Sequence, residues 1–359
     1  MKVLVRADAS GIIGTGHVRR CLTLADALVG QGASVIFVCR DHPGHLAAEI
    51  KARGFDCRLL PVEATASEGY APWLGASAEA DAVQTAAVAA ERGGVDVLIT
   101  DHYAIGRDWQ WALRPHARVI LAIDDLADRA HDADVLLDQN FGRTPAHYAA
   151  WVPPACKVLT GPAYALLRLE FAARRAEAQT RRALFSSVKR LLVSLGGTDP
   201  KGYTAHVLRL VGEVTGGAPL GVTAIVPDKA AAAALRQQPL GFPATIMEQA
   251  PDIAALLTAA DVAIGAVGGS AWERACLGLP TLALVLADNQ RPAAAELKSA
   301  GLVVDAVTTE ALTTDHIRRL IGLDAVAYAA LARANMAICD GAGALRVADV
   351  LFQVLREAA

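Results

Sequence analysis

The sequence lacks an uninterrupted apolar run long enough to span a bilayer, although 53% of its 359 residues are apolar. It also lacks an excess of basic residues, since the formal net charge is −3, and this argues against a general nucleic-acid binder. Met1 and Lys2 lead directly into a strand-like run, which leaves no room for a secretory signal. We therefore expect a cytoplasmic globular protein without membrane or nucleic-acid partners.

Motifs that hold metals and common cofactors are also missing. The six cysteines form no C-x-x-C pair and no cluster with metal-ligand spacing, so we expect reduced thiols and no metal site. The sequence contains no G-x-x-x-x-G-K-S/T loop, no H-E-x-x-H helix and no G-x-S-x-G elbow. The glycines of the first loop do not have G-x-G-x-x-G spacing, which disfavours a dinucleotide-dependent dehydrogenase. We expect no cofactor.

Apolar runs of strand length alternate with helix-like segments along the chain, and this predicts α/β domains with parallel sheets. Strands are predicted at 3–5, 35–38, 57–60, 95–100, 119–123, 135–137, 190–195, 222–226, 244–247, 262–264 and 281–286. A chain of this length is long for one core, so we expect two Rossmann-like domains with a ligand cleft between them. The predicted parts are an N-terminal sugar-binding and catalytic domain at 1–165, a linker at 166–188, a nucleotide-binding domain at 189–325, and C-terminal helices at 326–359 that can pack back on the first domain.

A glycine-bearing loop lies between the first predicted strand and the first predicted helix, within Arg6–Arg20. Gly14 and Gly16 permit a tight turn and a close approach of a ligand to the backbone. His17 falls in the first helical turn, where unpaired N–H groups and the helix dipole disfavour an imidazolium, so we expect a neutral ring that can act as a base. The alternative is a packing or capping histidine. The position at the carboxyl end of a strand, with Asp8 nearby, favours a ligand site.

Two glycine loops in the second half also follow predicted strands. In Gly196–Asp199 the backbone amides and the Thr198 hydroxyl can meet phosphate oxygens, although such turns often need glycine for geometry alone. In Gly268–Glu273 the loop amides can bind a diphosphate. There Glu273 either accepts hydrogen bonds from a ribose or forms a capping box with Ser270, because the two have capping-box spacing.

Polar side chains follow three other strands. Asn289 and Gln290 can hold sugar hydroxyl or acetamido groups, while simple helix capping in this segment is the alternative. Tyr103 ends a predicted strand and can bind a sugar or orient a water molecule. Asp124 and Asp125 end the next strand and can contribute, although acidic strand ends are common.

Several blocks together resemble a known family, the UDP-2,4-diacetamido-2,4,6-trideoxy-β-L-altropyranose hydrolases of the pseudaminic acid pathway, which are related to spore coat polysaccharide proteins. The similar blocks are Arg6–Ser10 with Ile13–Arg20, Asp101–Tyr103, Gly161–Arg168, Gly196–Asp199, Gly269–Ser270 with Glu273, and Asn289–Gln290. The resemblance extends over nearly the whole chain. Its first block is the most specific, whereas the C-terminal blocks are shared with relatives of the N-acetylglucosaminyltransferase of peptidoglycan synthesis.

The resemblance implies a GT-B fold and a metal-independent, inverting hydrolysis that releases UDP and the free sugar for nonulosonic acid synthesis, as used in flagellin glycosylation and surface polysaccharides. His17 would be the general base that activates water. Residues at the matched positions would bind the substrate, a UDP-sugar: Asp8, Gly14, Gly16, Tyr103, Tyr164, Arg168, Gly196, Gly197, Thr198, Asp199, Gly269, Ser270, Glu273, Asn289 and Gln290.

Two other functions remain open at this point. The first is a GT-B glycosyltransferase that moves the sugar from UDP to an acceptor; the absence of an apolar or basic run near 60–115, where a lipid acceptor would bind, favours water instead. The second is a module that binds a nucleotide sugar without turning it over. Release of UDP without an added acceptor discriminates the hydrolase from both.

Overall fold

A computed structural model describes residues 1–63, 68–196, 199, 201–216, 220–238, 240–248 and 250–358. The chain divides into two compact units. Unit 1 contains Met1–Leu166 and Ala342–Ala359, and unit 2 contains Leu167–Gly341. Among the described residues, no helix combines the length and the apolar character that crossing a membrane requires.

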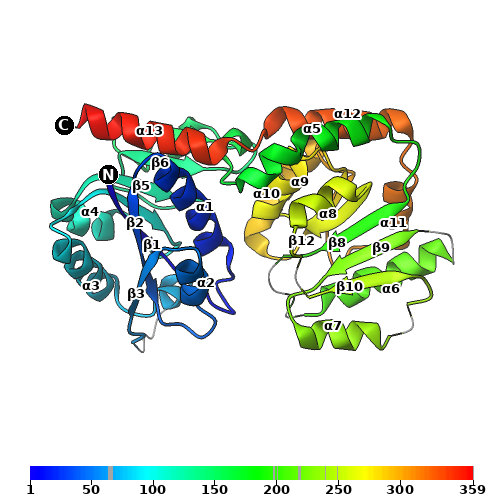
Figure 1. The fold of residues 1–359 in the computed structure, drawn as a ribbon, viewed down its shortest axis with the longest axis horizontal. Coiled ribbons are helices and arrows are strands. Elements are labelled where there is room, and N and C mark those ends of the chain that lie inside the picture. The colour runs from blue at the N-terminus through cyan, green and yellow to red at the C-terminus, as the bar shows by residue number, and fades with distance from the viewer. Residues whose placement is uncertain are drawn as a thin grey trace. The chain divides into compact units, whose positions relative to one another are not determined.

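Unit 1 is built on a seven-stranded parallel sheet with the strand order β3-β2-β1-β4-β5-β6-β7 (Figure 1). Its strands are β1 (Lys2–Ala7), β2 (Ser34–Arg40), β3 (Asp56–Leu60), β4 (Val95–Asp101), β5 (Ala117–Ile123), β6 (Val135–Asp138) and β7 (Lys157–Thr160). Its α-helices are α1 (Gly16–Gly30), α2 (Ala47–Ala52), α3 (Ala78–Glu91), α4 (Arg107–Leu113) and α13 (Gly343–Glu357). The run at 3–5 is continuously apolar because both faces of the sheet are buried.

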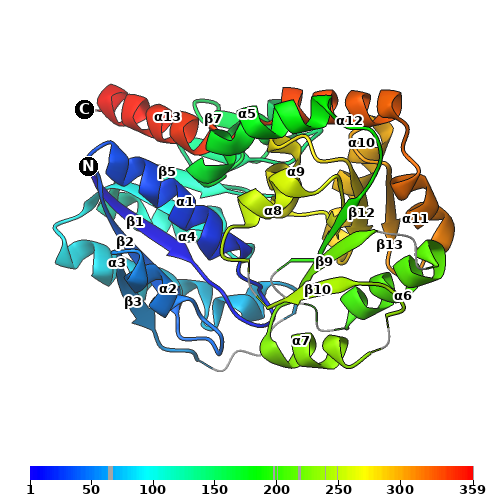
Figure 2. The same ribbon diagram turned by 45° about the vertical axis from the view of Figure 1, so that its right-hand side comes forward.

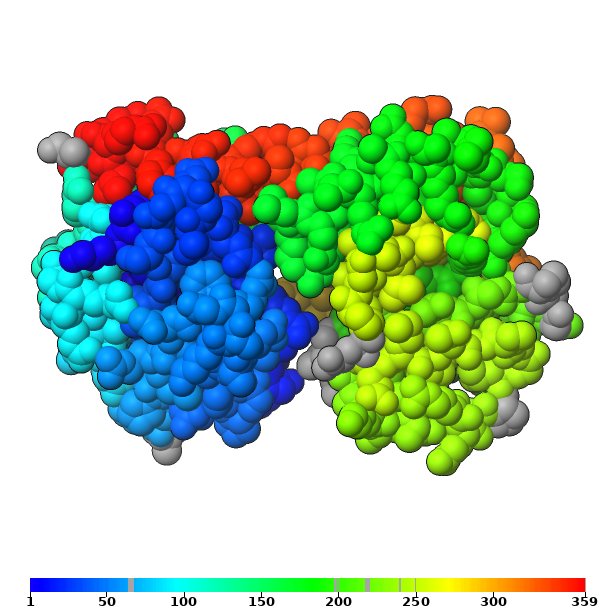
Figure 3. Space-filling model, viewed as in Figure 1, coloured from blue at the N-terminus to red at the C-terminus, as the bar shows by residue number. Residues whose placement is uncertain are grey.

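Helices cover both faces of this sheet. Val3 and Val5 point to the face on which α1 and α13 pack, and Leu4 points to the face covered by α3 and α4. The C-terminal helix α13, red in the figures, lies beside α1 (Figures 2 and 3). The last segment of the chain therefore completes the core of unit 1, with Val347 and Leu351 fully buried.

Unit 2 repeats the design with a six-stranded parallel sheet in the order β10-β9-β8-β11-β12-β13. Its strands are β8 (Arg190–Ser194), β9 (Gly221–Ile225), β10 (Ala244–Met247), β11 (Val262–Ala266), β12 (Thr281–Val285) and β13 (Asp305–Thr308). Its α-helices are α5 (Leu169–Ala183), α6 (Tyr203–Thr215), α7 (Lys229–Arg236), α8 (Ile253–Ala259), α9 (Gly269–Cys276), α10 (Arg291–Ser299), α11 (Thr314–Ile321) and α12 (Ala325–Ile338). The two parallel sheets confirm the predicted α/β class.

The boundary between the units differs from the expected one. The segment 166–188, predicted as a linker, contains α5, which packs against α8, α9 and α12 within unit 2. Arg182 of α5 is buried and donates hydrogen bonds to the carbonyls of Leu257 and Ala260. Of the C-terminal segment 326–359, the part up to Gly341 belongs to unit 2 and only the remainder to unit 1.

Strand order reverses at one point in each sheet, between β1 and β4 in unit 1 and between β8 and β11 in unit 2. In open parallel sheets, ligands bind outside the carboxyl ends of the strands at such switch points. The loop before His17 follows β1, and Asp101 ends β4. In unit 2 the segment 195–199 follows β8, and Val267–Gly268 follows β11. The sequence-predicted loops thus stand at the switch points.

Candidate functional site

The loop between β1 and α1 closes on itself before the helix begins. Gly14 adopts φ 80°, a conformation that favours glycine, and it exchanges backbone hydrogen bonds with Ser10. The Ser10 hydroxyl accepts hydrogen bonds from two further backbone amides of the loop. A Cβ atom added at Gly14 or Gly16 would meet no described atom within 4 Å, so the space beside both glycines is open.

His17 is the second residue of α1, and only 8% of its surface is exposed. Its Nδ1 atom lies 2.6 Å from Oδ1 of Asp101, the last residue of β4. Its ring lies edge-on to the Tyr103 ring, with 4.8 Å between the centroids. The first helical turn and the end of the neighbouring strand therefore together fix the orientation of the imidazole.

Asp101 is fully buried and also accepts two hydrogen bonds from Arg20, at 2.6 Å from Nε and 2.7 Å from Nη2. Burial alone would raise the pKa of the Asp101 carboxyl, but Arg20 and then His17 outweigh it and hold that pKa well below its usual range. An ionised carboxylate can only accept hydrogen bonds, so Nδ1 of His17 must carry the hydrogen that it shares with Asp101. When the ring is neutral, this arrangement leaves a lone pair on Nε2.

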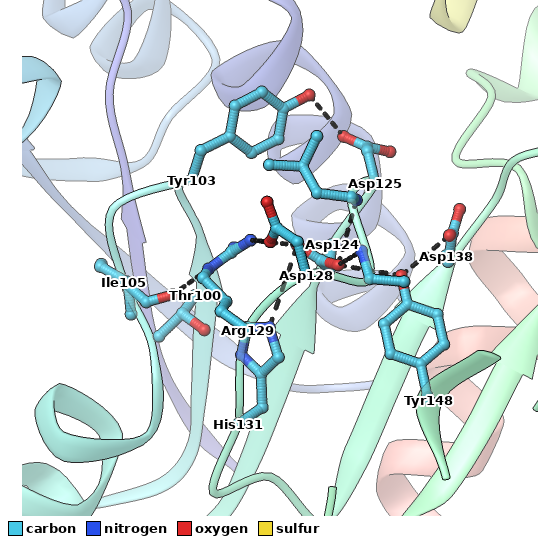
Figure 4. A network of polar contacts seen from close by, with 12 residues as sticks. Thr100, Tyr103, Ile105, Asp124, Asp125, Asp128, Arg129, His131, Asp138 and Tyr148 are labelled. Carbon is cyan, nitrogen blue, oxygen red and sulfur yellow. Dashed lines mark hydrogen bonds and ion pairs between the residues drawn. The ribbon is translucent and has the colours of Figure 1, made fainter. Parts of the chain in front are cut away.

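Arg20 also binds a second carboxylate, that of Asp125, and so links it to Asp101. Its Nη1 and Nη2 atoms donate to Asp125 at 3.0 and 2.8 Å. The Tyr103 hydroxyl donates to Asp125 Oδ2 at 2.9 Å (Figure 4). The contacts His17–Asp101–Arg20–Asp125–Tyr103–His17 form a closed circuit, which we call the His17 network. Burial, followed by the charge of Asp125, raises the pKa of Tyr103 far above its usual value, so its hydroxyl stays a donor.

A buried acidic cluster continues from Asp125 (Figure 4). The Asn140 side-chain amide donates to Asp125 at 3.1 Å and to Asp138 at 2.8 Å. The Tyr148 hydroxyl lies 2.8 Å from Asp138 and 2.9 Å from Asp124. A hydroxyl carries one hydrogen and can donate to only one of these carboxyls, so the arrangement fits a proton on the other. Burial, followed by repulsion from Asp125, raises the pKa of Asp138 to about 7.

The structure contradicts the substrate-binding role expected for Asp8. The sequence places it among the substrate-binding residues, but its side chain is fully buried and forms an ion pair with Arg6 at 2.7 Å. It also accepts a hydrogen bond from the Arg40 backbone amide. Arg6 and Arg40 both pair with Asp81 as well, so the Arg6–Asp8 block forms a buried ion cluster that supports β1 and β2. Asp8 therefore offers a ligand no exposed surface.

Tyr164 and Arg168 lie in different units. Tyr164 ends the 3-10 helix η4 (Pro162–Tyr164) and packs against the core of unit 1. Arg168 precedes α5 in unit 2, pairs with Glu170 at 2.9 Å and lies over the Phe171 ring. Neither belongs to the His17 network, and their predicted roles in substrate binding stay predictions.

The loop after β8 is described only in part, because Gly197 and Thr198 lie outside the described residues. Gly196 adopts φ 107°, which favours glycine. The Asp199 carboxylate accepts hydrogen bonds from the backbone amides of Tyr203 at 2.7 Å and Thr204 at 2.9 Å. The side chain of Asp199 therefore stabilises the start of α6.

At the second loop, α9 begins at Gly269 with Gly268 as its N-cap, and no described side chain caps this end. The capping box considered for Ser270 and Glu273 does not form, because both residues lie inside the helix. The Ser270 hydroxyl instead accepts a hydrogen bond from Arg274 Nη1 at 3.1 Å. The uncapped N–H groups at this helix start are suited to an anion.

Arg274 is a residue that the sequence reasoning missed. Its guanidinium is buried against Gly265, where a Cβ atom would lie 2.5 Å from Nη1, and it donates to the Ala266 carbonyl at 2.6 Å. Its Nε atom has no hydrogen-bond partner among the described residues. Burial lowers the pKa of Arg274 to about 10, and the charge of Glu273 opposes this only in part. A buried cation thus lies beside the start of α9.

The remaining predicted residues follow β12. Asn289 is exposed, while the Gln290 side chain accepts a hydrogen bond from the Leu286 amide at 2.9 Å and closes the turn. Asp288 pairs with Arg291, and no described side chain caps α10, so the capping alternative for this segment is not realised.

Unit 2 also contains an open depression of ≈ 640 Å³ at the carboxyl ends of β9 and β10. It is lined by Pro227, Asp228, Lys229, Arg236, Ile246, Met247, Glu248 and Pro251. None of the sequence-predicted site residues that the structure describes lies in this lining. Among the described residues, no group of three or more His, Cys, Asp or Glu side chains is arranged to hold a metal ion.

Comparison with curated proteins finds two relatives, whereas no family model matches the chain. The chain is 31% identical over 208 residues to the UDP-2,4-diacetamido-2,4,6-trideoxy-β-L-altropyranose hydrolase of Campylobacter jejuni, a match that covers 58% of this chain and 64% of that protein. The match thus spans less than two thirds of the length of this relative. Identity to the spore coat polysaccharide biosynthesis protein SpsG of Bacillus subtilis is 24% over 240 residues, or 66% of this chain and 69% of that protein.

Solved structures share the fold at low sequence identity. MurG of Acinetobacter baumannii has a TM-score of 0.71 at 16% identity, with 98% of this chain and 99% of that chain covered. The calicheamicin glycosyltransferase CalG4 has a TM-score of 0.65 at 16% identity, with 100% and 99% covered. These similarities confirm the predicted GT-B class of two Rossmann-like domains.

Proposed function

We propose that this chain, a GT-B protein related in sequence to the UDP-2,4-diacetamido-2,4,6-trideoxy-β-L-altropyranose hydrolase of Campylobacter jejuni, is itself a UDP-sugar hydrolase. Its substrate would be a UDP-linked 2,4-diacetamido-2,4,6-trideoxy hexose, cleaved at the anomeric carbon to UDP and the free sugar. The observation that carries the proposal is the His17–Asp101 pair at the switch point of the first sheet. The sequence relationship supports the class of substrate.

His17 is the general base of this reaction. Asp101 fixes the tautomer in which Nδ1 carries the hydrogen, so that Nε2 can take a proton from a water molecule. The water oxygen bonds to the anomeric carbon, and the bond from that carbon to the UDP oxygen breaks with its electron pair on the diphosphate. Attack on the face opposite the departing UDP inverts the anomeric configuration.

The other members of the His17 network are positioning residues. Arg20 is held between two carboxylates and fixes Asp101 through two hydrogen bonds. Asp125 fixes Tyr103 by its hydroxyl, and the Tyr103 ring lies nearly perpendicular to the His17 ring. Tyr103 then limits the rotation of the imidazole and contributes an aromatic surface to the sugar site.

The UDP is the ligand of unit 2. The uncapped start of α9, at Gly269 and Ser270, presents N–H groups to the diphosphate, and Arg274 adds a buried positive charge beside them. Stabilising the negative charge that develops on the leaving diphosphate lowers the barrier without a metal ion. Gly196 and Asn289 are among the residues predicted to supply further nucleotide and sugar contacts.

The test is incubation of the pure protein with the UDP-sugar and no acceptor, with UDP release and the product anomer followed by NMR. We expect UDP release by the wild type and a loss of about two to four orders of magnitude in His17→Ala, the usual effect of removing a general base, with UDP affinity unchanged. His116→Ala, at the end of the 3-10 helix η2 (Arg114–His116) in the same unit, is the matched control.

Two outcomes would contradict the proposal. UDP release that requires an added acceptor indicates a glycosyltransferase. Tight binding of the UDP-sugar without turnover by the wild type indicates a binding module.

A further inference from the structure

Three aromatic rings gather beside the catalytic histidine. Tyr103, which lies edge-on to His17, is nearly parallel to Trp73 with 5.7 Å between the ring centroids. Tyr70 lies edge-on to both, 5.0 Å from the Tyr103 ring and 4.8 Å from the Trp73 ring. All three residues are neither fully buried nor fully exposed, so each keeps part of its surface accessible. We call Tyr70, Trp73 and Tyr103 the aromatic platform.

The segment that carries Tyr70 and Trp73 is held in place by packing against the core and by a contact with His42. It forms the 3-10 helix η1 (Ala71–Leu74), and Leu74 is 2% exposed in the core of unit 1. The Trp73 carbonyl lies 2.8 Å from Nε2 of His42, the second residue after β2. Gly75 adopts φ 63°, and a Cβ atom there would lie 2.8 Å from the His42 ring, so only glycine permits this close approach.

Tyr103 connects the aromatic platform to His17, the proposed general base. Its hydroxyl is held by Asp125, and its ring contacts both His17 and Trp73. A reacting carbon must lie within about 3–3.5 Å of the attacking water that His17 activates. The part of the substrate beside the platform is therefore the sugar that carries this carbon, since the nucleotide is assigned to unit 2.

Half-exposed aromatic rings favour apolar groups, and ligand sites commonly combine such rings with a few polar groups that fix orientation. A 2,4-diacetamido-2,4,6-trideoxy sugar carries three methyl groups, two on its acetamido substituents and one at C6. A hexose with hydroxyls at C4 and C6 would place polar groups against the rings and lose their hydration. The platform is suited to the first kind of sugar.

We propose that Tyr70, Trp73 and Tyr103 form the specificity surface of the sugar site, which receives methyl groups of the acetamido or 6-deoxy substituents. This inference rests on the proposed hydrolase function, and it assigns recognition of these methyl groups to the aromatic platform. Trp73 is the member best suited to a test, because it lies one ring away from His17 and does not touch it in the contacts described.

The experiment compares kcat/KM for two substrates, the UDP-linked diacetamido-trideoxy hexose and UDP-N-acetylglucosamine, in wild type, Trp73→Ala and Trp73→Phe. A methyl-sized apolar contact typically changes discrimination by about 10–200-fold. We expect Trp73→Ala to reduce the preference for the diacetamido sugar within that range, and Trp73→Phe to restore most of it. Trp111→Ala, which truncates a tryptophan that is 72% exposed on α4, is the matched control and should leave the preference unchanged.

If Trp73→Ala leaves the ratio of the two kcat/KM values unchanged, whether or not both values fall, the specificity role is overturned. Equilibrium binding of the same two UDP-sugars in a His17→Ala background provides a readout that needs no turnover. A binding preference that depends on Trp73, in a protein whose wild type hydrolyses neither sugar, would reject the hydrolase and retain the platform. A binding preference that survives Trp73→Ala would reject the platform whatever the activity.

Discussion

Asp101→Asn is the substitution that separates an oriented base from a histidine that is merely present. The carboxylate accepts hydrogen bonds from His17 Nδ1 at 2.6 Å and from two nitrogens of Arg20 at 2.6 and 2.7 Å. The amide has nearly the same shape, but one of its two acceptor atoms becomes a donor. In either orientation of the amide, its NH₂ group faces at least one N–H of Arg20.

The two orientations have different consequences for catalysis. With the NH₂ group toward His17, Nδ1 must accept a hydrogen bond, so the hydrogen moves to Nε2 and the base is lost. With the oxygen toward His17, the tautomer is retained, but the NH₂ group lies against Nε of Arg20 in a buried site. Comparable substitutions in Ser-His-Asp sites reduce kcat about 10⁴-fold through the wrong tautomer. We expect kcat/KM of Asp101→Asn to fall about 10²–10⁴-fold, which corresponds to about 3–5 kcal/mol of transition-state stabilisation.

The assay is UDP release from the UDP-sugar, together with UDP affinity by calorimetry and a thermal melt that establishes folding. UDP affinity should stay the same, because the change lies in unit 1. The matched control is Asp124→Asn, which also removes a buried carboxylate paired with an arginine at a neighbouring strand end, without contact to His17. Activity of Asp101→Asn within threefold of wild type, or an equal loss in the control, would refute the reasoning.

Two further predictions concern stability and its pH dependence, both measured by urea unfolding. Burial alone would raise the pKa of Asp81, but Arg6 and then Arg40 lower it from 3.8 to about 2, so its ion pairs contribute about 2–3 kcal/mol above pH 4 that is lost as the pH falls toward 2. Asp81→Asn should destabilise the protein by about 3–5 kcal/mol at pH 7, and an unchanged midpoint would contradict this. Burial and then Asp125 raise the pKa of Asp138 to about 7, so its protonated form stabilises the fold at low pH and this contribution is lost as the pH rises from about 4 to 7. Relative to wild type, Asp138→Asn should remove a fall in stability of about 4 kcal/mol over that range, and parallel pH profiles of the two proteins would exclude the assignment.

Local pattern was sufficient to predict most of the fold. The apolar runs of β1, β4 and β12 are continuous because both faces of a parallel sheet are buried. The position of His17 at a helix start also follows from local signals, since Gly14 and Gly16 mark the turn before it. The strands without a prediction, β7 and β13, have four residues each.

The contacts that give the candidate site its chemistry are not local, and the sequence alone does not predict them. Arg20 pairs with Asp101 and Asp125, which are 81 and 105 residues away in the chain. Asp8 had the same sequence signal as a site residue, an acidic side chain just after a strand, yet its ion pair with Arg6 puts it in the core. Only the parallel register of β1 with β4, which aligns Ala7 with Asp101, determines which carboxylate meets the histidine.

The charges at the two switch points differ in a way that fits the roles proposed for the two units. In unit 1 two carboxylates already balance the charge of Arg20. Burial would lower the pKa of Arg20, yet Asp101 and Asp125 raise it well above its ordinary value. In unit 2 the opposite holds, because burial lowers the pKa of Arg274 to about 10 and its neighbours do not restore it. A diphosphate would gain little beside Arg20, where it would meet two carboxylates, whereas beside Arg274 it would add to the partial compensation that the charge of Glu273 provides. The acidic switch point therefore suits a base and a neutral water molecule, and the cationic one suits the leaving group.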